Sequence, residues 1–516
     1  MPVGVICIVL ICLAAYIPAI RSGFVWDDYA MLTGNIVLEK SGLYRSWFSA
    51  SQNNYWPVTW TSYWLEHKLW GLKPAGYHIT NIIIHAVCAV LIWRVLIQLN
   101  IPAAFTAALI FAVHPVNVES VAWVAQRKTI LAMLFFLPAL FCYLRFDRAG
   151  KKFFYILSVI LFIAAMLSKG SVVGLPVVVL SCVWWLRGTV SKRDIIRSMP
   201  FFAVSAVMSI VEIWFQYNRT ICEDVVRSDS FLSRLAGAGW AVWFYLYKAV
   251  LPINLTFIYP RWHIDPANMM SYVPGLLLIV SVVLAWWRRN GWGRPVFFVF
   301  IYFVVMLFPV LGFFNIYFMR YSLVADHYQY VSIISVIALV TGIVYRYLGA
   351  GVLRIAAVLV LMLLGSATWQ QSSRYKNAIT LWEDTLRKAP NCAMAHNNLG
   401  NLLQFQGKIE AAVSHFYQAI NKDPNFFEAY NNLGNALLLQ GKADEAIFYY
   451  SRSLEINPAN ARTHYNLATA LQSQGRSEEA LAHYNRAIEL ASAENNQQLI
   501  DQIRKKLESC GQPEKN

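Results

Sequence analysis

Long apolar segments alternate with short polar ones through roughly the first 370 residues. Each apolar segment is long enough, or nearly so, to cross a bilayer core of about 30 Å as a helix. The pattern predicts an all-α, polytopic membrane bundle of about eleven spans. The expected spans are 3–20, 79–98, 102–114, 128–145, 153–168, 171–187, 198–216, 272–287, 295–313, 328–346 and 351–369.

Basic residues in the short loops predict the orientation of the bundle, because cytoplasmic loops are enriched in Lys and Arg. A crossing at 235–251 would break the parity between two such loops, so this stretch is expected to lie at the interface or to be re-entrant. The N-terminus is then inside and the C-terminus outside the cytoplasm. The basic clusters are Arg145, Arg148, Lys151 and Lys152; Arg187, Lys192, Arg193 and Arg197; Arg288, Arg289 and Arg294; and Arg346 with Arg354.

The pattern changes after about residue 373, where it repeats every 34 residues or so. Gly400, Gly434 and Ala468 occupy one repeated position, and Pro390, Pro424 and Pro458 occupy another. This spacing is typical of the paired helices of tetratricopeptide repeats (TPRs). The predicted domains are a membrane domain at 1–373, with an outer loop at 21–78, and an α-solenoid at 374–510. The solenoid comprises a half-repeat at 374–392, full repeats at 393–426, 427–460 and 461–494, and a polar capping helix at 495–509.

Composition supports this division and excludes several functional classes. The chain of 516 residues is 58% hydrophobic and 14% charged, whereas a soluble protein carries about a quarter charged residues. The net charge of +15 lies largely in loops, which favours membrane orientation over nucleic-acid binding. The eight cysteines form no Cys-x-x-Cys pair, so neither a zinc site nor a disulfide framework is indicated. No cofactor or metal site is expected, and membrane lipids are the expected surroundings.

Ionisable residues gather on the outer side of the predicted topology. Residues that were merely tolerated at membrane depth would occur on both sides. Asp27 and Asp28 follow the first apolar run, and Glu119 and Glu212 belong to the same layer. Opposite them are candidate phosphate-binding residues: His78, His114, Arg127, Lys128, Lys169, Arg261 and His327. A carboxylate can act as general base on a hydroxyl, and cations can stabilise a phosphate leaving group. These residues suit transfer of a sugar from a polyprenyl-phosphate carrier.

The aspartate pair allows more than one interpretation. Either Asp27 or Asp28 can be the catalytic base, and the other can bind substrate or cap a following helix. A solvated loop or a simple helix cap is the alternative for both. In the TPRs, Asn398, Asn432 and Asn466 share one repeat position and are candidates for binding an extended acceptor peptide. Asparagine at this position can equally be structural.

Several segments resemble one known family. The chain resembles bacterial membrane proteins with a glycosyltransferase-C (GT-C) fold followed by TPRs, and is similar to the transmembrane-and-TPR (TMTC-like) protein O-mannosyltransferases. The matching segments are 26–28, 76–81 with 84–85, 114–125, 127–128, 168–169, 252–255, 259–260 and 325–328. The resemblance implies an inverting transferase that uses a dolichol- or undecaprenyl-phosphate sugar. Its proposed base is an acidic residue in the first outer loop, which corresponds to Asp27 or Asp28.

Two positions depart from the family pattern. The chain has Gln126-Arg127-Lys128-Thr129 where members often have Glu-Arg-Lys-Asp, and His327 where they have Arg. The resemblance leaves the sugar and the acceptor open, with a protein Ser/Thr hydroxyl expected. The alternatives are a non-catalytic TPR membrane scaffold for envelope assembly and a glycan- or lipid-modifying transferase. Short loops and few repeats favour a bacterial inner membrane with periplasmic TPRs over an endoplasmic reticulum membrane with luminal TPRs.

Overall fold

The architecture is helical throughout the described residues. The structure is a computed structural model that describes residues 2–32, 41–50, 52–221, 226–493 and 496–509. Within these ranges every regular element is a helix, as the hydrophobic pattern predicted. The chain divides into two compact units, Met1–Asn377 and Ala378–Asn516.

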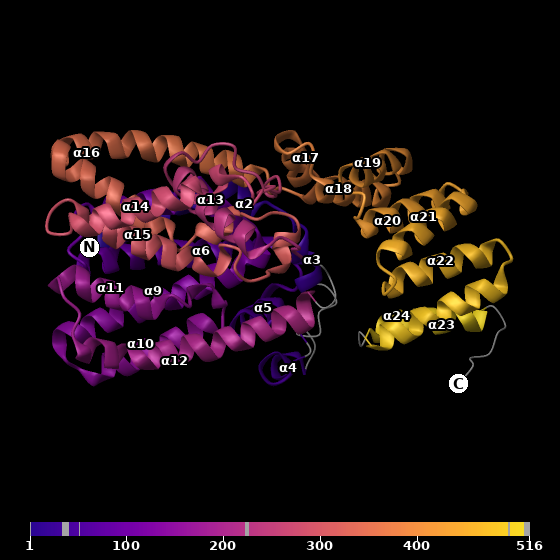
Figure 1. Cartoon of the computed structure of the whole chain (residues 1–516), viewed down its shortest axis with the longest axis horizontal. Coiled ribbons are helices and arrows are strands. Elements are labelled where there is room, and N and C mark those ends of the chain that lie inside the picture. The colour runs from indigo at the N-terminus through magenta and orange to yellow at the C-terminus, as the bar shows by residue number, and fades with distance from the viewer. Residues whose placement is uncertain (1, 33–40, 51, 222–225, 494–495, 510–516) are drawn as a thin grey trace. The chain divides into compact units, whose positions relative to one another are not determined.

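The first unit is a bundle of apolar helices (Figure 1). Its helices are α1 (Pro2–Ala15), α2 (Ile17–Ile20), α3 (Asp27–Leu32), α4 (Gly42–Phe48), α5 (Pro57–Trp70), α6 (Pro74–Gln98), α7 (Ala104–Ala112), α8 (Val118–Ala122), α9 (Arg127–Ala149), α10 (Lys152–Met166), α11 (Leu175–Arg187), α12 (Lys192–Phe215), α13 (Phe231–Val250), α14 (Val273–Trp287), α15 (Gly293–Leu307) and α16 (Ile333–Ser373).

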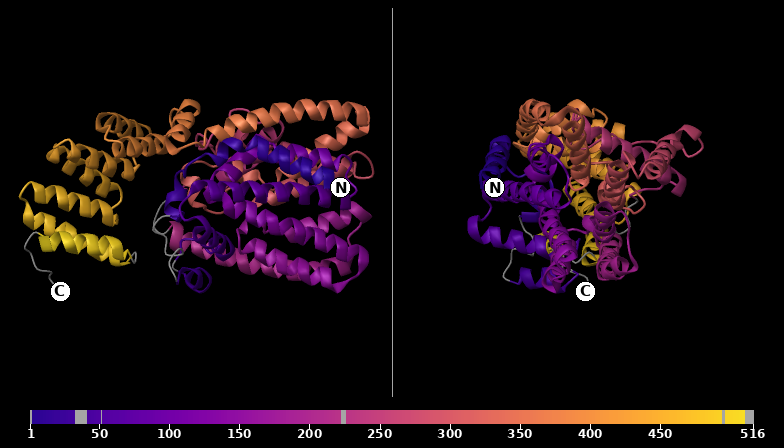
Figure 2. Two further views of the ribbon diagram at one scale, coloured as in Figure 1. Left: turned by 180° about the vertical axis from the view of Figure 1, so that it is seen from behind. Right: turned by 90° about the vertical axis from the view of Figure 1, so that its left-hand side faces the viewer.

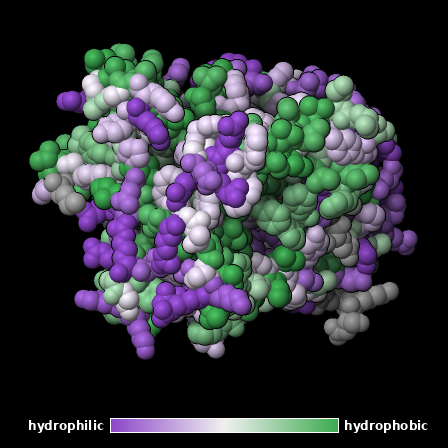
Figure 3. All heavy atoms as spheres, turned by 60° about the vertical axis from the view of Figure 1, so that its left-hand side comes forward, coloured by the Kyte–Doolittle hydropathy of each residue, from purple (hydrophilic) through white to green (hydrophobic). Residues whose placement is uncertain are grey.

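Packing between these helices follows their apolar faces. Helix α9 packs on α6 and α10, and α11 packs on α12 and α15. Figure 2 shows the ribbon from behind and from one side. Large apolar side chains on α14, such as Leu276 and Ile279, remain exposed. Figure 3 shows broad hydrophobic patches on one face of the molecule, interrupted by hydrophilic residues. Such exposed apolar surface is typical of a membrane protein, in which lipid covers it.

The predicted count of about eleven spans is not confirmed. Among the described residues, seven helices are long and apolar enough to cross a membrane, or eight if the bent pair Ala104–Ala112 and Pro115–Ala122 is one span. The first and fifth expected spans form helices of 14 and 15 residues, which is short for a bilayer core. The last expected span and most of the one before it lie in α16, whose 41 residues are interrupted where Gly349 adopts a φ of 79°. The observed helices therefore differ in length and continuity from the expected spans, although each expected segment contains a helix.

The stretch 235–251 forms most of helix α13, which begins after Ser230. It is not among the helices apolar enough to cross a membrane. It packs on α14, where the indole nitrogen of Trp243 donates a hydrogen bond to the Pro274 carbonyl (2.9 Å). Its placement at the interface, or as a re-entrant segment, stays a prediction.

The second unit is a series of paired helices. They are α17 (Ala378–Lys388), α18 (Ala393–Phe405), α19 (Ile409–Lys422), α20 (Phe427–Leu439), α21 (Ala443–Ile456), α22 (Ala461–Ser473), α23 (Ser477–Ala493) and α24 (Gln497–Ser509). Gly434 lies against the ring of Tyr450, so the small residue lets α20 and α21 approach closely. Gly407, Gly441 and Gly475 each adopt a φ of 75–78° where a helix ends. Residue 495, the predicted start of the capping helix, lies outside the described residues.

The described cysteines are free thiols: Cys7, Cys12, Cys88, Cys142, Cys182 and Cys392. Cys222 and Cys510 lie outside the described residues.

Candidate functional site

A cavity of about 740 Å³ opens within the first unit. Its walls come from α3, from the segments before α3 and α5, from α9, α11, α12 and α15, and from the loops around 169 and 308–328. The charged and titratable residues on its walls include Asp27, Lys128, Lys169, Glu212 and His327. Opposite charges in one enclosed space make this cavity the candidate site.

The two neighbouring aspartates have different environments. Asp27 lines the cavity, and burial raises its pKa to about 6, while nearby Lys128 lowers it. Asp28 is fully buried, and its two carboxylate oxygens accept hydrogen bonds from the backbone N–H groups of Val25 (2.9 Å) and Ala125 (2.6 Å). Burial raises the pKa of Asp28 to about 8, against the effect of these donors. Asp28 therefore fastens the start of α3 to the segment before α9, and Asp27 is the carboxylate that faces the cavity.

Aromatic rings flank Asp27. The preceding residue, Trp26, has a φ of 44°, a left-handed conformation that is unfavourable for an L-residue with a bulky side chain. Its ring stacks on Trp123, with centroids 5.4 Å apart, and both rings line the cavity. Backbone strain of this kind often occurs at functional sites, and flat indole faces suit the apolar face of a sugar ring.

Lys128 and Glu212 meet at a third tryptophan. The Lys128 ammonium lies 4.5 Å from the centroid of the Trp56 ring. The indole nitrogen of Trp56 donates to both carboxylate oxygens of Glu212, each at 3.2 Å. This group brings the outer loop, α9 and α12 together at the cavity wall and fixes a cation beside a carboxylate.

Lys169 approaches the same wall from the loop between α10 and α11. Its ammonium donates a hydrogen bond to the Thr129 hydroxyl (2.9 Å), which in turn donates to the side-chain oxygen of Gln126 (2.7 Å). Burial, with the neighbouring charge of Lys128, lowers the pKa of Lys169 to about 7. Lys169 can therefore gain or lose its charge near neutral pH.

His327 is oriented by Glu119. The Glu119 carboxylate accepts hydrogen bonds from the backbone N–H of His327 (2.9 Å) and from its ring Nδ1 (2.8 Å). Burial and the charges of Lys169 and Lys128 hold the pKa of His327 well below its usual value, so the ring is neutral. With the proton on Nδ1, Nε2 carries a lone pair and can accept a hydrogen bond at the cavity.

Arg127 lies next to this site in sequence but does not line the cavity. Its buried guanidinium donates to the side chain of Asn81, to Glu66 (2.6 Å) and to the Tyr77 carbonyl (2.9 Å). It thereby ties α9 to α5 and α6.

His78 and His114 are also buried away from the cavity wall. The His78 ring contacts the Gly23 carbonyl (3.4 Å). The His114 ring contacts the Ala249 carbonyl (3.2 Å) and accepts from the backbone N–H of Val116 (3.4 Å). The cavity thus gathers three of the seven predicted phosphate-binding residues, Lys128, Lys169 and His327.

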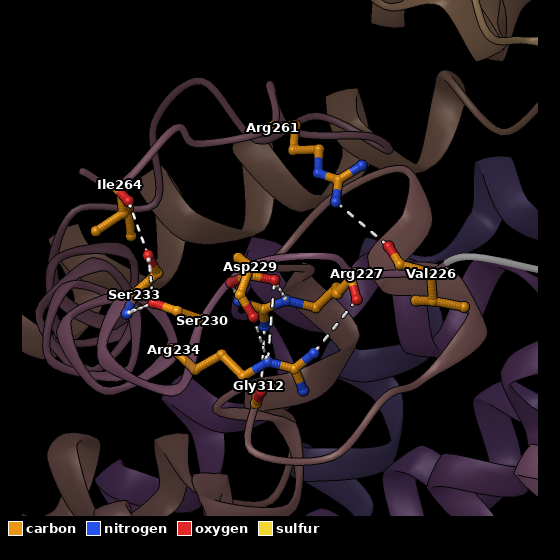
Figure 4. Close-up of polar contacts among 9 residues, drawn as sticks. All are labelled: Val226, Arg227, Asp229, Ser230, Ser233, Arg234, Arg261, Ile264 and Gly312. Carbon is orange, nitrogen blue, oxygen red and sulfur yellow. Dashed lines mark hydrogen bonds and ion pairs between the residues drawn. The ribbon is translucent and has the colours of Figure 1, made fainter. Parts of the chain in front are cut away.

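Arg261 is exposed and belongs to a separate network (Figure 4). It donates to the carbonyls of Val226 (3.3 Å) and Arg320 (3.2 Å). Beside it, Arg227 forms an ion pair with Asp229 and donates to the Gly312 carbonyl (3.2 Å). These contacts hold the loops that follow α12 and α15, and Arg261 does not line the cavity.

The sequence placed Glu119 and Glu212 in the outer layer but assigned them no role. Glu212 follows a long apolar run, and a lone carboxylate in such a run is the signal that points to a function. For Glu119 the informative contact is with a residue more than two hundred positions away, which no local pattern reveals.

The repeat asparagines take part in contacts within the solenoid. The amide nitrogen of Asn432 donates to Asn397 (2.9 Å), and that of Asn466 donates to Asn431 (2.9 Å). These bonds join neighbouring repeats. Peptide binding by Asn398, Asn432 and Asn466 stays a prediction.

A second cavity, of about 540 Å³, lies between α6, α11, α15 and α16. Its walls are mainly apolar, with Arg294 and Arg346 among the lining residues. It offers no carboxylate, so it lacks the base that the predicted chemistry requires.

Comparisons with known proteins agree with the two-part organisation. Two family models, described as TPR repeat and tetratricopeptide repeat, match residues 405–441 and 425–493. A protein O-mannosyl-transferase of Caenorhabditis elegans, F38B6.6, is 25% identical over 430 residues, which cover 78% of this chain and 60% of that protein. The human TMTC3 is 30% identical over 33% of this chain and 20% of its own length.

Mouse TMTC2 is 32% identical over 26% of this chain and 18% of its own. The chain thus spans 60% of the first of these relatives and about a fifth of the other two. Among solved structures, MamA is 23% identical over 27% of this chain and 81% of its own, with a TM-score of 0.22.

Proposed function

We propose that this TMTC-like membrane protein with C-terminal TPRs is a glycosyltransferase that moves a sugar from a polyprenyl-phosphate carrier to a hydroxyl of an acceptor protein. The observation that carries the proposal is the cavity in the bundle, which has Asp27 and Glu212 on the same walls as Lys128 and Lys169. Three relatives named protein O-mannosyl-transferases support the reaction class and favour mannose as the sugar.

The proposed reaction is a direct displacement. The acceptor oxygen attacks the anomeric carbon, its proton passes to the Asp27 carboxylate, and the bond from that carbon to the phosphate oxygen breaks. The electron pair leaves with the phosphate. Configuration at the anomeric carbon inverts, because attack and departure occur on opposite faces.

Each neighbouring group has a role in this step. Lys128 and Lys169 stabilise the charge that develops on the departing phosphate. Trp26 and Trp123 pack against the sugar, and the neutral His327, oriented by Glu119, accepts a hydrogen bond from a sugar hydroxyl. Glu212 holds Trp56 and the ammonium groups in position.

We place the protein in a bacterial inner membrane, with the cavity and the TPRs on the periplasmic side. The acceptor peptide is then bound in part by Asn398, Asn432 and Asn466. Their side-chain oxygens accept hydrogen bonds from the peptide, or the bonds between repeats are replaced by bonds to the peptide. The basic loops and the short connections of the bundle support this orientation.

The proposal is tested by reconstituting the full chain in nanodiscs with a mannose-labelled polyprenyl phosphate and a Ser/Thr-rich peptide. Mass spectrometry should find peptide carrying one hexose. Lys128→Met should lower the rate by about a hundredfold or more, because a preorganised cation is lost. The matched control is Lys68→Met, whose ammonium contacts Trp64 outside the cavity and whose loss should leave the rate unchanged.

Two results would contradict the proposal. One is unmodified peptide with every polyprenyl-phosphate sugar offered, which favours the scaffold. The other is label found on lipid or glycan in place of peptide, which favours a glycan- or lipid-modifying transferase.

A further inference from the structure

Two histidine pairs occupy equivalent places in the first and third repeats. His396 on α18 faces His415 on α19, with their Nδ1 atoms 3.0 Å apart. His464 on α22 faces His483 on α23 in the same way, with their Nδ1 atoms 2.9 Å apart. His464 is buried, but His396, His415 and His483 are partly accessible to solvent, so a small ion can reach each pair.

A backbone carbonyl fixes one ring of each pair. The Nε2 atom of His396 lies 3.2 Å from the Pro390 carbonyl oxygen, and that of His464 lies 3.1 Å from the Pro458 carbonyl oxygen. Because a carbonyl can only accept, Nε2 of this ring carries the proton and its Nδ1 carries a lone pair, which accepts a hydrogen bond from the Nδ1–H of the facing ring. When a metal ion binds, the facing ring changes tautomer, so that its proton moves to Nε2 and its Nδ1 becomes free to coordinate. A carbonyl that holds the far ring nitrogen is the usual support of a metal-binding histidine.

In the second repeat, tyrosines stand at the two positions that the histidines occupy in the first and third. They are Tyr430 and Tyr449, whose rings pack with centroids 6.4 Å apart. These are therefore ring-packing positions in all three repeats. In two of them the rings bring paired nitrogen ligands together.

We propose that each histidine pair binds a divalent transition-metal ion, with Cu(II) preferred, through its two Nδ1 atoms. Metal–imidazole bonds are about 2.0–2.1 Å long, so nitrogens 2.9–3.0 Å apart subtend about 90° at the metal. That angle fits adjacent positions of a square-planar or octahedral ion better than a tetrahedral one, and imidazole suits Cu(II) and Ni(II).

Each proposed site uses two protein ligands. No group of three or more His, Cys, Asp or Glu side chains in the described part of the chain is placed to hold a metal. Water completes the coordination sphere, and binding links the two helices of one repeat.

The test measures Cu(II) bound by the full chain, purified in detergent without a histidine tag. The substitutions are H396Y with H415Y, H464Y with H483Y, and all four together, because tyrosine already occupies both positions in the second repeat. We expect each pair change to remove one equivalent of bound Cu(II) and the fourfold change to remove two. Electron paramagnetic resonance of wild type should show two coordinated nitrogens per ion.

Circular dichroism checks that each variant keeps its helix content. If the tyrosine pairs lower it, the single changes H415Q and H483Q replace them, with the same loss expected. The proposal is overturned if a folded variant binds as much Cu(II) as wild type.

Discussion

At the residue scale, two adjacent carboxylates take on different tasks. Sequence showed that Asp27 and Asp28 lie in the first outer loop, but not which of them is available to substrate. Neighbouring helical residues point about 100° apart, so one side chain can face a cavity while the next faces the core. The partner that decides this is the backbone N–H of Ala125, which is brought to Asp28 by tertiary folding.

The first prediction concerns pH. Asp27 acts as base only when ionised, and its pKa is raised to about 6, so activity should fall as pH drops below about 6. Lys169 stabilises phosphate only when protonated, and its pKa is lowered to about 7, so activity should also fall as pH rises above about 7. The profile of kcat/KM should be bell-shaped between these values.

A matched substitution separates the acid limb of the pH profile from the alkaline limb. Lys169→Arg keeps the cation charged at all working pH values, so the alkaline limb should move upward while the acid limb stays. An alkaline limb that does not move would contradict the role of Lys169.

The second prediction concerns Asp28. Asp28→Asn leaves one of two buried N–H donors without a carboxylate partner, which should cost about 1–3 kcal/mol of stability. Thermal unfolding in detergent measures the loss. Asp27→Asn is the control, and it should unfold at the wild-type temperature, since Asp27 lines a cavity. Equal stability of the two variants would reject the structural role.

At the element scale, the hydrophobic pattern located helices better than it counted crossings. The expected span 351–369 and most of the span 328–346 fall within α16, which is broken at Gly349. The apolar runs also predicted longer helices than α1 and α10, which end after 14 and 15 residues. The repeat helices were more predictable, because glycine and proline recur at fixed positions and mark where each helix ends.

The third prediction concerns the contact between α13 and α14. A Cβ atom at Gly239 would lie 2.7 Å from the backbone nitrogen of Gly275, which cannot move aside. Gly239→Ala should therefore push the helices apart and cost about 1–3 kcal/mol. Gly275→Ala is the matched control, since a Cβ there has no neighbour within 4 Å. The unfolding temperatures of the two variants in detergent should differ, and equal values would argue against close packing at Gly239.

At the scale of the whole molecule, sequence predicted a membrane bundle followed by TPRs, and both features are present. The site was predicted in part. Asp27, Lys128, Lys169 and His327 line one cavity, whereas Arg127, His78 and His114 have partners elsewhere in the bundle. Hydrophobic pattern and charge select residues at one depth, but which of them share a cavity depends on how the helices rotate and pack.

The fourth prediction concerns topology. A reporter fused after Asn516 should behave as non-cytoplasmic, because the basic loops orient the bundle with its C-terminal part outside. Alkaline phosphatase, active in the periplasm, and green fluorescent protein, fluorescent in the cytoplasm, give opposite signals. A fluorescent, phosphatase-negative fusion would reverse the proposed orientation.

Asp27 is the proposed base of a sugar transfer in the bundle cavity, and this role has a direct kinetic consequence. The role is tested most directly by kcat/KM for transfer to peptide, measured for wild type, Asp27→Asn and Glu212→Gln in nanodiscs. Asp27→Asn should lower kcat/KM by about 10²–10⁴-fold while the protein keeps its wild-type unfolding temperature. Full activity of folded Asp27→Asn, with the large loss found in Glu212→Gln instead, would contradict this role.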